Sequence, residues 1–133
     1  MSRKCIISAA VMFIMAWALS FFVHGVLLYG DYSKMQTWMR PQSEATTLMA
    51  YMIFAQALFG VAFAWIYAQG RNDNPWLMQG VRFGIAVAAL TMVPTYLIYH
   101  VVTPVPLVVA LKQIAFDTIR VVLMGIVIAW MHR

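Results

Sequence analysis

The chain has 133 residues, of which 64% are hydrophobic and 10% are charged, and its formal net charge is +5. Because a soluble domain carries about 25% charged residues, this composition and the mean hydropathy of +0.82 exclude a soluble globular domain and indicate a membrane protein. The positive charge reflects a scarcity of acids rather than a run of Lys and Arg, so no nucleic-acid partner is expected. The single cysteine, Cys5, excludes an internal disulfide framework and a cysteine-based metal cluster.

Four apolar stretches follow one another along the chain, and each is long enough to cross a bilayer as a helix. Their approximate limits are residues 5–30, 46–69, 76–102 and 106–131. Because the links between them are short, consecutive helices are expected to be antiparallel neighbours. The predicted fold is therefore all-α, an integral membrane antiparallel four-helix bundle forming one transmembrane domain, residues 1–133.

The first stretch follows the residues Ser-Arg-Lys at positions 2–4, a charge pattern that resembles a secretory signal. The apolar run, however, continues to about Tyr29, and no small-residue cleavage site ends a short core. A run of this length spans a bilayer at about 1.5 Å per residue. We interpret it as a first transmembrane helix with a signal-anchor charge pattern.

The three links between the stretches differ in character. Residues 31–45 are polar and include Trp38, and they are expected to form a short interfacial helix or a simple connector. Residues 70–75 are dense in turn formers. Residues 103–106 are a hinge with two prolines, which cannot continue the preceding helix.

Two further features concern the second and third stretches. Pro94, in the middle of the third stretch, removes one backbone hydrogen bond and predicts a bend there. Small residues at four-residue spacing let helices approach closely in lipid, and they predict packing faces within this chain or against another. These ridges are Gln56, Gly60, Ala64 and Ala68 on the second stretch, and Gly80, Gly84 and Ala88 on the third.

The distribution of basic residues predicts the orientation in the membrane. Positive charge favours the cytoplasmic side, and the side that holds both termini and the second link carries Arg3, Lys4, Arg71, Arg82 and Arg133. The opposite side carries Lys34 and Arg40. Aromatic belts agree with this orientation, with Trp65, Tyr67, Trp76 and Trp130 inside and Tyr29, Tyr32, Trp38 and Tyr99 outside. We expect a multi-pass protein of the cell inner membrane with both termini in the cytoplasm.

The last stretch carries a polar stripe, formed by Lys112, Gln113, Asp117 and Arg120. A charge near the centre of a spanning helix costs roughly 2.5–3.5 kcal/mol on insertion scales, and these side chains fall within an arc of roughly 140° at about 100° per residue. Three interpretations remain open for Asp117 and Arg120: an internal ion pair, a site for a proton, ion or polar ligand, and a contact with another subunit. Lys112 can also extend its long side chain toward the membrane surface.

Depth along the predicted helices groups the polar residues into one intramembrane cluster near the outer leaflet. Its members are His24, Gln56, His100, Lys112, Asp117 and Arg120. Two histidines on different helices can ligate haem iron, but His100 is predicted to lie nearer the surface than His24, so the fit is poor. No metal-ligand spacing recurs, and we predict neither a metal nor a cofactor. His24 is expected to form a hydrogen bond across helices or back to Ser20.

Catalytic signatures are absent from the sequence. It contains no Gly-rich phosphate loop, no HExxH, no CxxC, no nucleophile elbow and no recognisable pair of carboxylates. We therefore predict no catalytic residues and no enzymatic activity.

Four segments carry a resemblance that covers nearly the whole chain. They are FVHGVLL at 22–28, WMRP at 38–41 with Glu44, PWLMQGVRFG at 75–84 and KQIAFDTIR at 112–120. Together they resemble small four-helix bacterial inner-membrane proteins of unassigned function. The resemblance implies the bundle fold and implies no activity.

Small size, little mass outside the membrane and several packing ridges favour one function. The sequence predicts a non-catalytic accessory or assembly subunit of a larger membrane complex, such as an energy-converting one. Its expected partners are the lipid bilayer and other membrane subunits or further copies of itself. The alternative is a small transporter or channel-like carrier that uses the intramembrane polar cluster.

Overall fold

The computed structural model describes residues 2–35, 37 and 39–133, and these residues contain helices and no strand. The all-α prediction is confirmed for this part of the chain. Four helices are long and apolar enough to cross a membrane: Arg3–Leu27, Met49–Gly70, Trp76–Val102 and Leu107–Met131. By length and composition the protein is thus compatible with a multi-pass membrane protein.

The first span changes its winding before it ends. Helix α1 (Arg3–Phe22) is capped by Ser2, whose hydroxyl accepts a hydrogen bond from the backbone N–H of Cys5 at 3.3 Å. It continues into a π-helical turn, η1 (Val23–Leu27), and the short helix α2 (Tyr29–Ser33) follows. π-turns are rare and frequently occur at functional sites, and this one carries His24.

The first link contains a short helix, α3 (Gln42–Thr47), directly before α4 (Met49–Gly70). Trp38, which the sequence placed in a possible interfacial helix, lies outside the described residues.

The third span is divided at Thr91 into α5 (Trp76–Leu90) and α6 (Met92–Val102). Pro94 has no N–H, so the carbonyl of Leu90 lacks its usual helical donor. At the same point the Thr91 hydroxyl and the Thr91 N–H both donate to the carbonyl of Val87, at 2.7 and 2.9 Å. The sequence predicted a bend at Pro94, and the structure divides the span three residues earlier. After the proline-containing link, α7 (Leu107–Met131) completes the chain.

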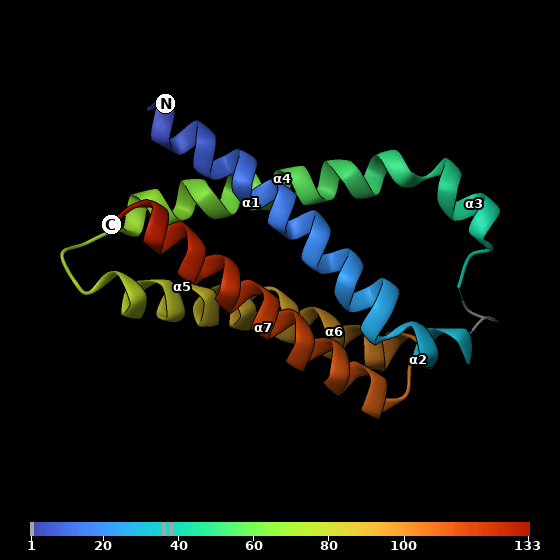
Figure 1. The fold of residues 1–133 in the computed structure, drawn as a ribbon. Coiled ribbons are helices and arrows are strands. Elements are labelled where there is room, and N and C mark those ends of the chain that lie inside the picture. Colours follow the sequence, from blue (N-terminus) through green and yellow to red (C-terminus); the bar gives the residue numbers. More distant parts are fainter. Residues whose placement is uncertain (1, 36, 38) are drawn as a thin grey trace.

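The helices pack mainly in two pairs: α1 lies along α4, and α5 with α6 lies along α7, while α1 also contacts α7. Both termini and the turn between α4 and α5 gather at one end of the molecule, which we call the terminal end (Figure 1). Helix α2 and the link between α6 and α7 lie at the other end, the α2 end (Figure 1).

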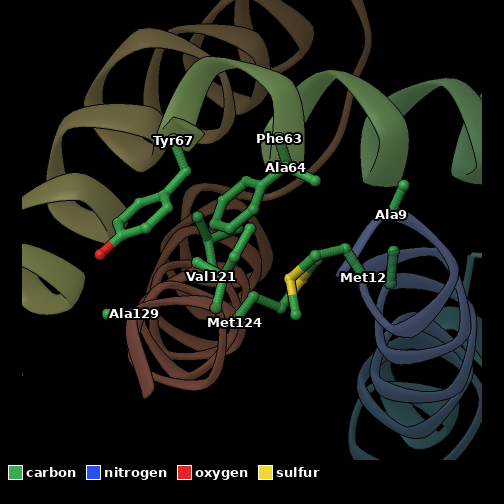
Figure 2. Packing of buried hydrophobic residues seen from close by; sticks show 10 residues of the cluster. Ala9, Met12, Phe63, Ala64, Tyr67, Val121, Met124 and Ala129 are labelled. Atoms are coloured by element: carbon green, nitrogen blue, oxygen red, sulfur yellow. The ribbon is translucent and has the colours of Figure 1, made fainter. Parts of the chain in front are cut away.

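The apolar core joins the two pairs. Figure 2 shows side chains of α1, α4 and α7 meeting, among them Met12, Phe63 and Met124. The ring of Phe63 also lies against that of Phe83 on α5, with centroids 4.7 Å apart. Helix α4 contributes to this core from Phe59 onward, whereas residues 50–55 are all exposed: Tyr51 is 76% and Phe54 68% exposed.

Glycines permit the closest helix contacts. A Cβ added at Gly60 would lie 2.5 Å from the backbone nitrogen of Phe13 on α1. One added at Gly80 would lie 2.5 Å from the carbonyl oxygen of Gly125 on α7. The structure thus places the small residues of α4 against α1 and those of α5 against α7, which is the arrangement that close packing in lipid requires.

We predict that Gly84→Ala destabilises the protein by about 1–3 kcal/mol, the usual range for overpacking. Its Cβ would lie 2.5 Å from the Cα of Val122, so α5 and α7 must separate. Unfolding in mixed detergent micelles measures the effect. Gly30→Ala is the matched control, because a Cβ at Gly30 meets nothing within 4 Å. Equal stability of the two variants would contradict the close contact.

Candidate functional site

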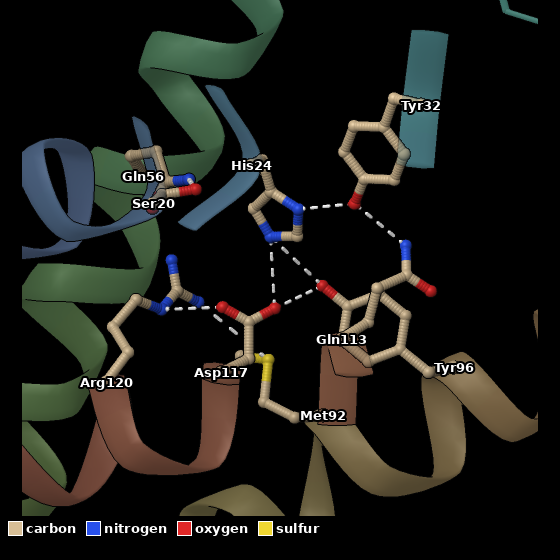
Figure 3. Close-up of polar contacts among 9 residues, drawn as sticks. All are labelled: Ser20, His24, Tyr32, Gln56, Met92, Tyr96, Gln113, Asp117 and Arg120. Carbon is tan, nitrogen blue, oxygen red and sulfur yellow. Dashed lines mark hydrogen bonds and ion pairs between the residues drawn. The ribbon is translucent and has the colours of Figure 1, made fainter. Parts of the chain in front are cut away.

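The candidate site is a polar network centred on Asp117, a side chain of α7 that is 0% exposed. One carboxylate oxygen, Oδ2, lies 3.1 Å from Nε2 of His24 on η1 and accepts a hydrogen bond from the hydroxyl of Tyr96 on α6. The other oxygen, Oδ1, lies 3.1 Å from Nε of Arg120, one turn along α7. Figure 3 shows these side chains converging from three separate elements.

A second layer of hydrogen bonds surrounds His24. Gln113 Nε2 donates to the Tyr32 hydroxyl at 2.9 Å, and that hydroxyl lies 2.6 Å from His24 Nδ1. Because the Tyr32 oxygen accepts from Gln113, its own hydrogen is free to point at Nδ1. In the arrangement where the Tyr32 hydroxyl donates to Nδ1, a neutral His24 carries its hydrogen on Nε2 and donates it to Asp117. This tautomer is assigned from the network.

The network is electrically neutral in this state. The Asp117 carboxylate and the Arg120 guanidinium cancel, and the assigned form of His24 adds no charge. Neutrality matters because an uncompensated charge in an apolar interior costs several kcal/mol. The arrangement therefore satisfies a strong physical demand of a membrane interior.

Arg120 is held more by charge than by hydrogen bonds. Its side chain is 6% exposed, and Nη2 has only the sulfur of Met92, at 3.8 Å. The buried Nη1 has no hydrogen-bond partner among the described residues, and the Nε–Oδ1 contact lacks the alignment of a hydrogen bond. The guanidinium carbon lies 5.9 Å from the ring centroid of Phe59, which adds a cation–π contact.

The structure brings together some of the residues that the sequence grouped as one cluster. His24, Asp117 and Arg120 are in direct contact. Gln56 lies near them but donates to the Ser20 hydroxyl, at 3.1 Å, and so links α4 to α1 (Figure 3).

Two predicted members of the cluster have other partners. Lys112 reaches Asp31 at the α2 end, where Nζ lies 3.1 Å from both carboxylate oxygens. His100 has its Nδ1 2.7 Å from the carbonyl oxygen of Val105, so it braces the link between α6 and α7. His24 and His100 therefore have separate polar environments.

Two members of the network were missed from the sequence. Tyr96 was given no role, and Tyr32 was assigned to the outer aromatic belt. The available signal for Tyr96 was a phenol well inside an apolar stretch, close to Pro94. For Tyr32 no local signal existed, because its contacts with His24 and Gln113 depend on the π-turn and on α7.

A cleft of about 780 Å³ lies beside the network at the α2 end. It is lined by His24, Gly25, Tyr29, Tyr32, Ser33 and residues 39–42. The side chain of His24 is 28% exposed whereas that of Asp117 is fully buried, so His24 separates the cleft from the carboxylate. The arrangement allows a proton or a polar group in the cleft to reach His24 without contacting Asp117 directly.

The side chains that could ligate a metal ion do not favour a resident metal site. Within the described residues, no group of three or more His, Cys, Asp and Glu side chains lies close enough to hold one. The only such contact pair in the network, His24 with Asp117, is already joined by a hydrogen bond.

We predict that Asp117→Asn destabilises the protein by about 3–5 kcal/mol, because it leaves Arg120 buried without a counter-charge. The double variant Asp117→Asn/Arg120→Gln should recover part of this loss, and unfolding in mixed micelles measures both. Glu44→Gln is the control, because its ion pair with Arg40 is exposed and is worth about 0–1 kcal/mol. Arg120→Gln alone completes the cycle, and a double variant whose loss equals the sum of the two single losses would contradict the coupling.

Comparison with known proteins adds no assignment: no protein-family model, curated protein or solved structure matches the chain.

Proposed function

We propose that the protein is a non-catalytic, multi-pass membrane protein that acts as an accessory or assembly subunit of a larger membrane complex. In this proposal its four spans cross a bacterial inner membrane as an antiparallel bundle with both termini in the cytoplasm. The excess of basic residues at the terminal end supports that orientation.

One observation carries the proposal: residues 50–55, near the start of α4, are exposed on every side of the helix. Residues Tyr51, Met52, Ile53 and Phe54 are consecutive and all exposed, and at about 100° per residue they cover the whole circumference of a helix. The second half of the same helix is packed, with Phe63 buried in the core. In lipid, helices are stabilised by packing against one another, so the uncovered residues 50–55 offer a surface for another subunit.

The use of polar groups within the site supports a structural role. Asp117 is engaged by three side chains of its own chain, and both nitrogens of His24 lie at hydrogen-bonding distance from partners. These contacts hold η1, α6 and α7 together. Each of these contacts joins parts of the same chain, as a structural role requires.

The proposal is tested by native purification in mild detergent with mass spectrometry. A membrane partner should co-purify at constant stoichiometry, and Ala55→Trp, in the exposed residues 50–55 of α4, should abolish this. Ala86→Trp is the matched control, because Ala86 is also exposed but lies on α5. A protein that purifies alone as a stable monomer, or a partner lost equally from both variants, would overturn the proposal.

The cleft favours a second candidate function, a small carrier with a polar intramembrane site. His24 lines this cleft and contacts the buried Asp117, and intramembrane ionisable residues often mark proton or ion pathways. Toward the terminal end, however, α7 continues past Arg120 with buried apolar residues such as Val121 and Met124.

Proton flux in proteoliposomes, followed with a pH-sensitive dye, tests the carrier. His24→Gln removes the titrating group but keeps a donor toward Asp117, and it should reduce flux at least tenfold. Glu44→Gln, which neutralises an exposed carboxylate, should leave flux unchanged. Equal flux in wild type and in a correctly folded His24→Gln protein would exclude the carrier.

A further inference from the structure

Positive charge at the terminal end is not balanced by the chain itself. Three of the four acids form ion pairs elsewhere: Asp31 with Lys112, Glu44 with Arg40, and Asp117 with Arg120. The remaining acid, Asp73, shares the terminal end with basic residues that form no ion pair within the described part of the chain. These residues are Arg3, Lys4, Arg71, Arg82 and Arg133.

His132 lies among these basic residues at the terminal end. This side chain is almost fully buried, and its Nε2 lies 2.7 Å from the hydroxyl of Ser8. Burial and the positive charges of Lys4 and Arg71 lower the pKa of His132 below its usual value. The field at this end therefore disfavours a further cation and favours an anion.

A hollow of about 260 Å³ lies at this end between α4 and α5. Its apolar part is formed by Ile66, Tyr67 and Phe83, and the rings of Tyr67 and Phe83 are 5.3 Å apart. Arg82, an exposed residue within the first two turns of α5, also lines the hollow.

The turn beside the hollow is braced by Gln79. Its amide nitrogen donates to the carbonyls of Asn72 and Asn74, and its amide oxygen accepts from the backbone N–H of Asn72 at 3.2 Å. The side chain of Asn72 uses its oxygen to accept from the backbone of Asn74. Its NH₂ group therefore remains a donor at the rim of the hollow.

We propose that this hollow binds the headgroup end of an anionic phospholipid, with Arg82 as the phosphate ligand and Ile66 and Phe83 against the glycerol and first acyl carbons. A guanidinium offers paired donors that match the oxygens of a phosphate. The apolar wall between two spanning helices favours a lipid over free phosphate, because free phosphate has no apolar part to bury there. This site is independent of the proposed subunit role.

Binding is measured by native mass spectrometry and by thermal shift of the detergent-purified full chain titrated with phosphatidylglycerol. Phosphatidylglycerol should bind and raise the melting temperature, and phosphatidylcholine should bind at least fivefold more weakly. Arg82→Gln should weaken phosphatidylglycerol binding about fivefold, which corresponds to about 1 kcal/mol. Arg82→Lys, which keeps the charge, should retain most of the affinity.

Arg3→Gln is the matched control, because Arg3 is exposed at the same end and does not line the hollow. An equal loss in Arg3→Gln and Arg82→Gln would show general attraction to positive charge and would overturn the site. Competition by inorganic phosphate at the same concentration would overturn the lipid assignment. Circular dichroism of each variant verifies that its helices are intact.

Discussion

The buried carboxylate of Asp117, on the mainly apolar helix α7, determines which side chains must surround it at the α2 end. An ionised carboxylate there requires a counter-charge and hydrogen-bond donors, because neither water nor lipid supplies them. Arg120 provides the charge from the same helix, whereas the donors come from His24 and Tyr96 on two other elements. A buried ion pair adds little net stability over apolar packing, yet losing one partner is costly. The network therefore acts chiefly by giving one arrangement of η1, α6 and α7 a much lower free energy than the alternative arrangements.

The two ends of the molecule are held by different interactions. Toward the terminal end, glycine contacts bring α5 against α7 and α1 against α4, and apolar side chains fill the space between the pairs. At the α2 end, polar contacts replace this packing: Lys112 binds Asp31, and Gln113 binds Tyr32. None of these polar contacts reaches residues 50–55 of α4, which are all exposed, whereas the next residue, Gln56, binds Ser20 on α1. The helices of this small chain are packed to different extents along their lengths. This difference is the physical basis for expecting a neighbouring protein against the exposed part of α4.

The four spans and the central pair were accessible from the sequence for a simple reason. Apolar runs of bilayer length are conspicuous, and Asp117 with Arg120 stands out within such a run. Tyr96 and Tyr32 were not accessible, because a tyrosine in a membrane segment is compatible both with an interfacial belt and with an internal hydrogen bond. His100 was grouped with the cluster by counting depth along a straight helix. The structure gives it a nearer acceptor, the carbonyl of Val105, which a proline-containing link leaves available.

The extent of the network distinguishes the two functional candidates. Neutralising Arg120 requires only Asp117, yet the hydrogen bonds continue through His24 and Tyr32 to the cleft. The hydrogen bonds from His24 through Tyr32 to the cleft are more than is needed to hold α7 in place. They would suit a side chain that exchanges a proton with the cleft. In the opposite direction the described residues that follow Arg120 on α7 are apolar where they are buried, so this helix does not continue the polar network toward the terminal end. A complete pathway would require further polar groups from a second protein or a second copy. A subunit role requires a partner against residues 50–55 of α4, but it requires no polar group beyond those already in contact, and on this ground we prefer the subunit role.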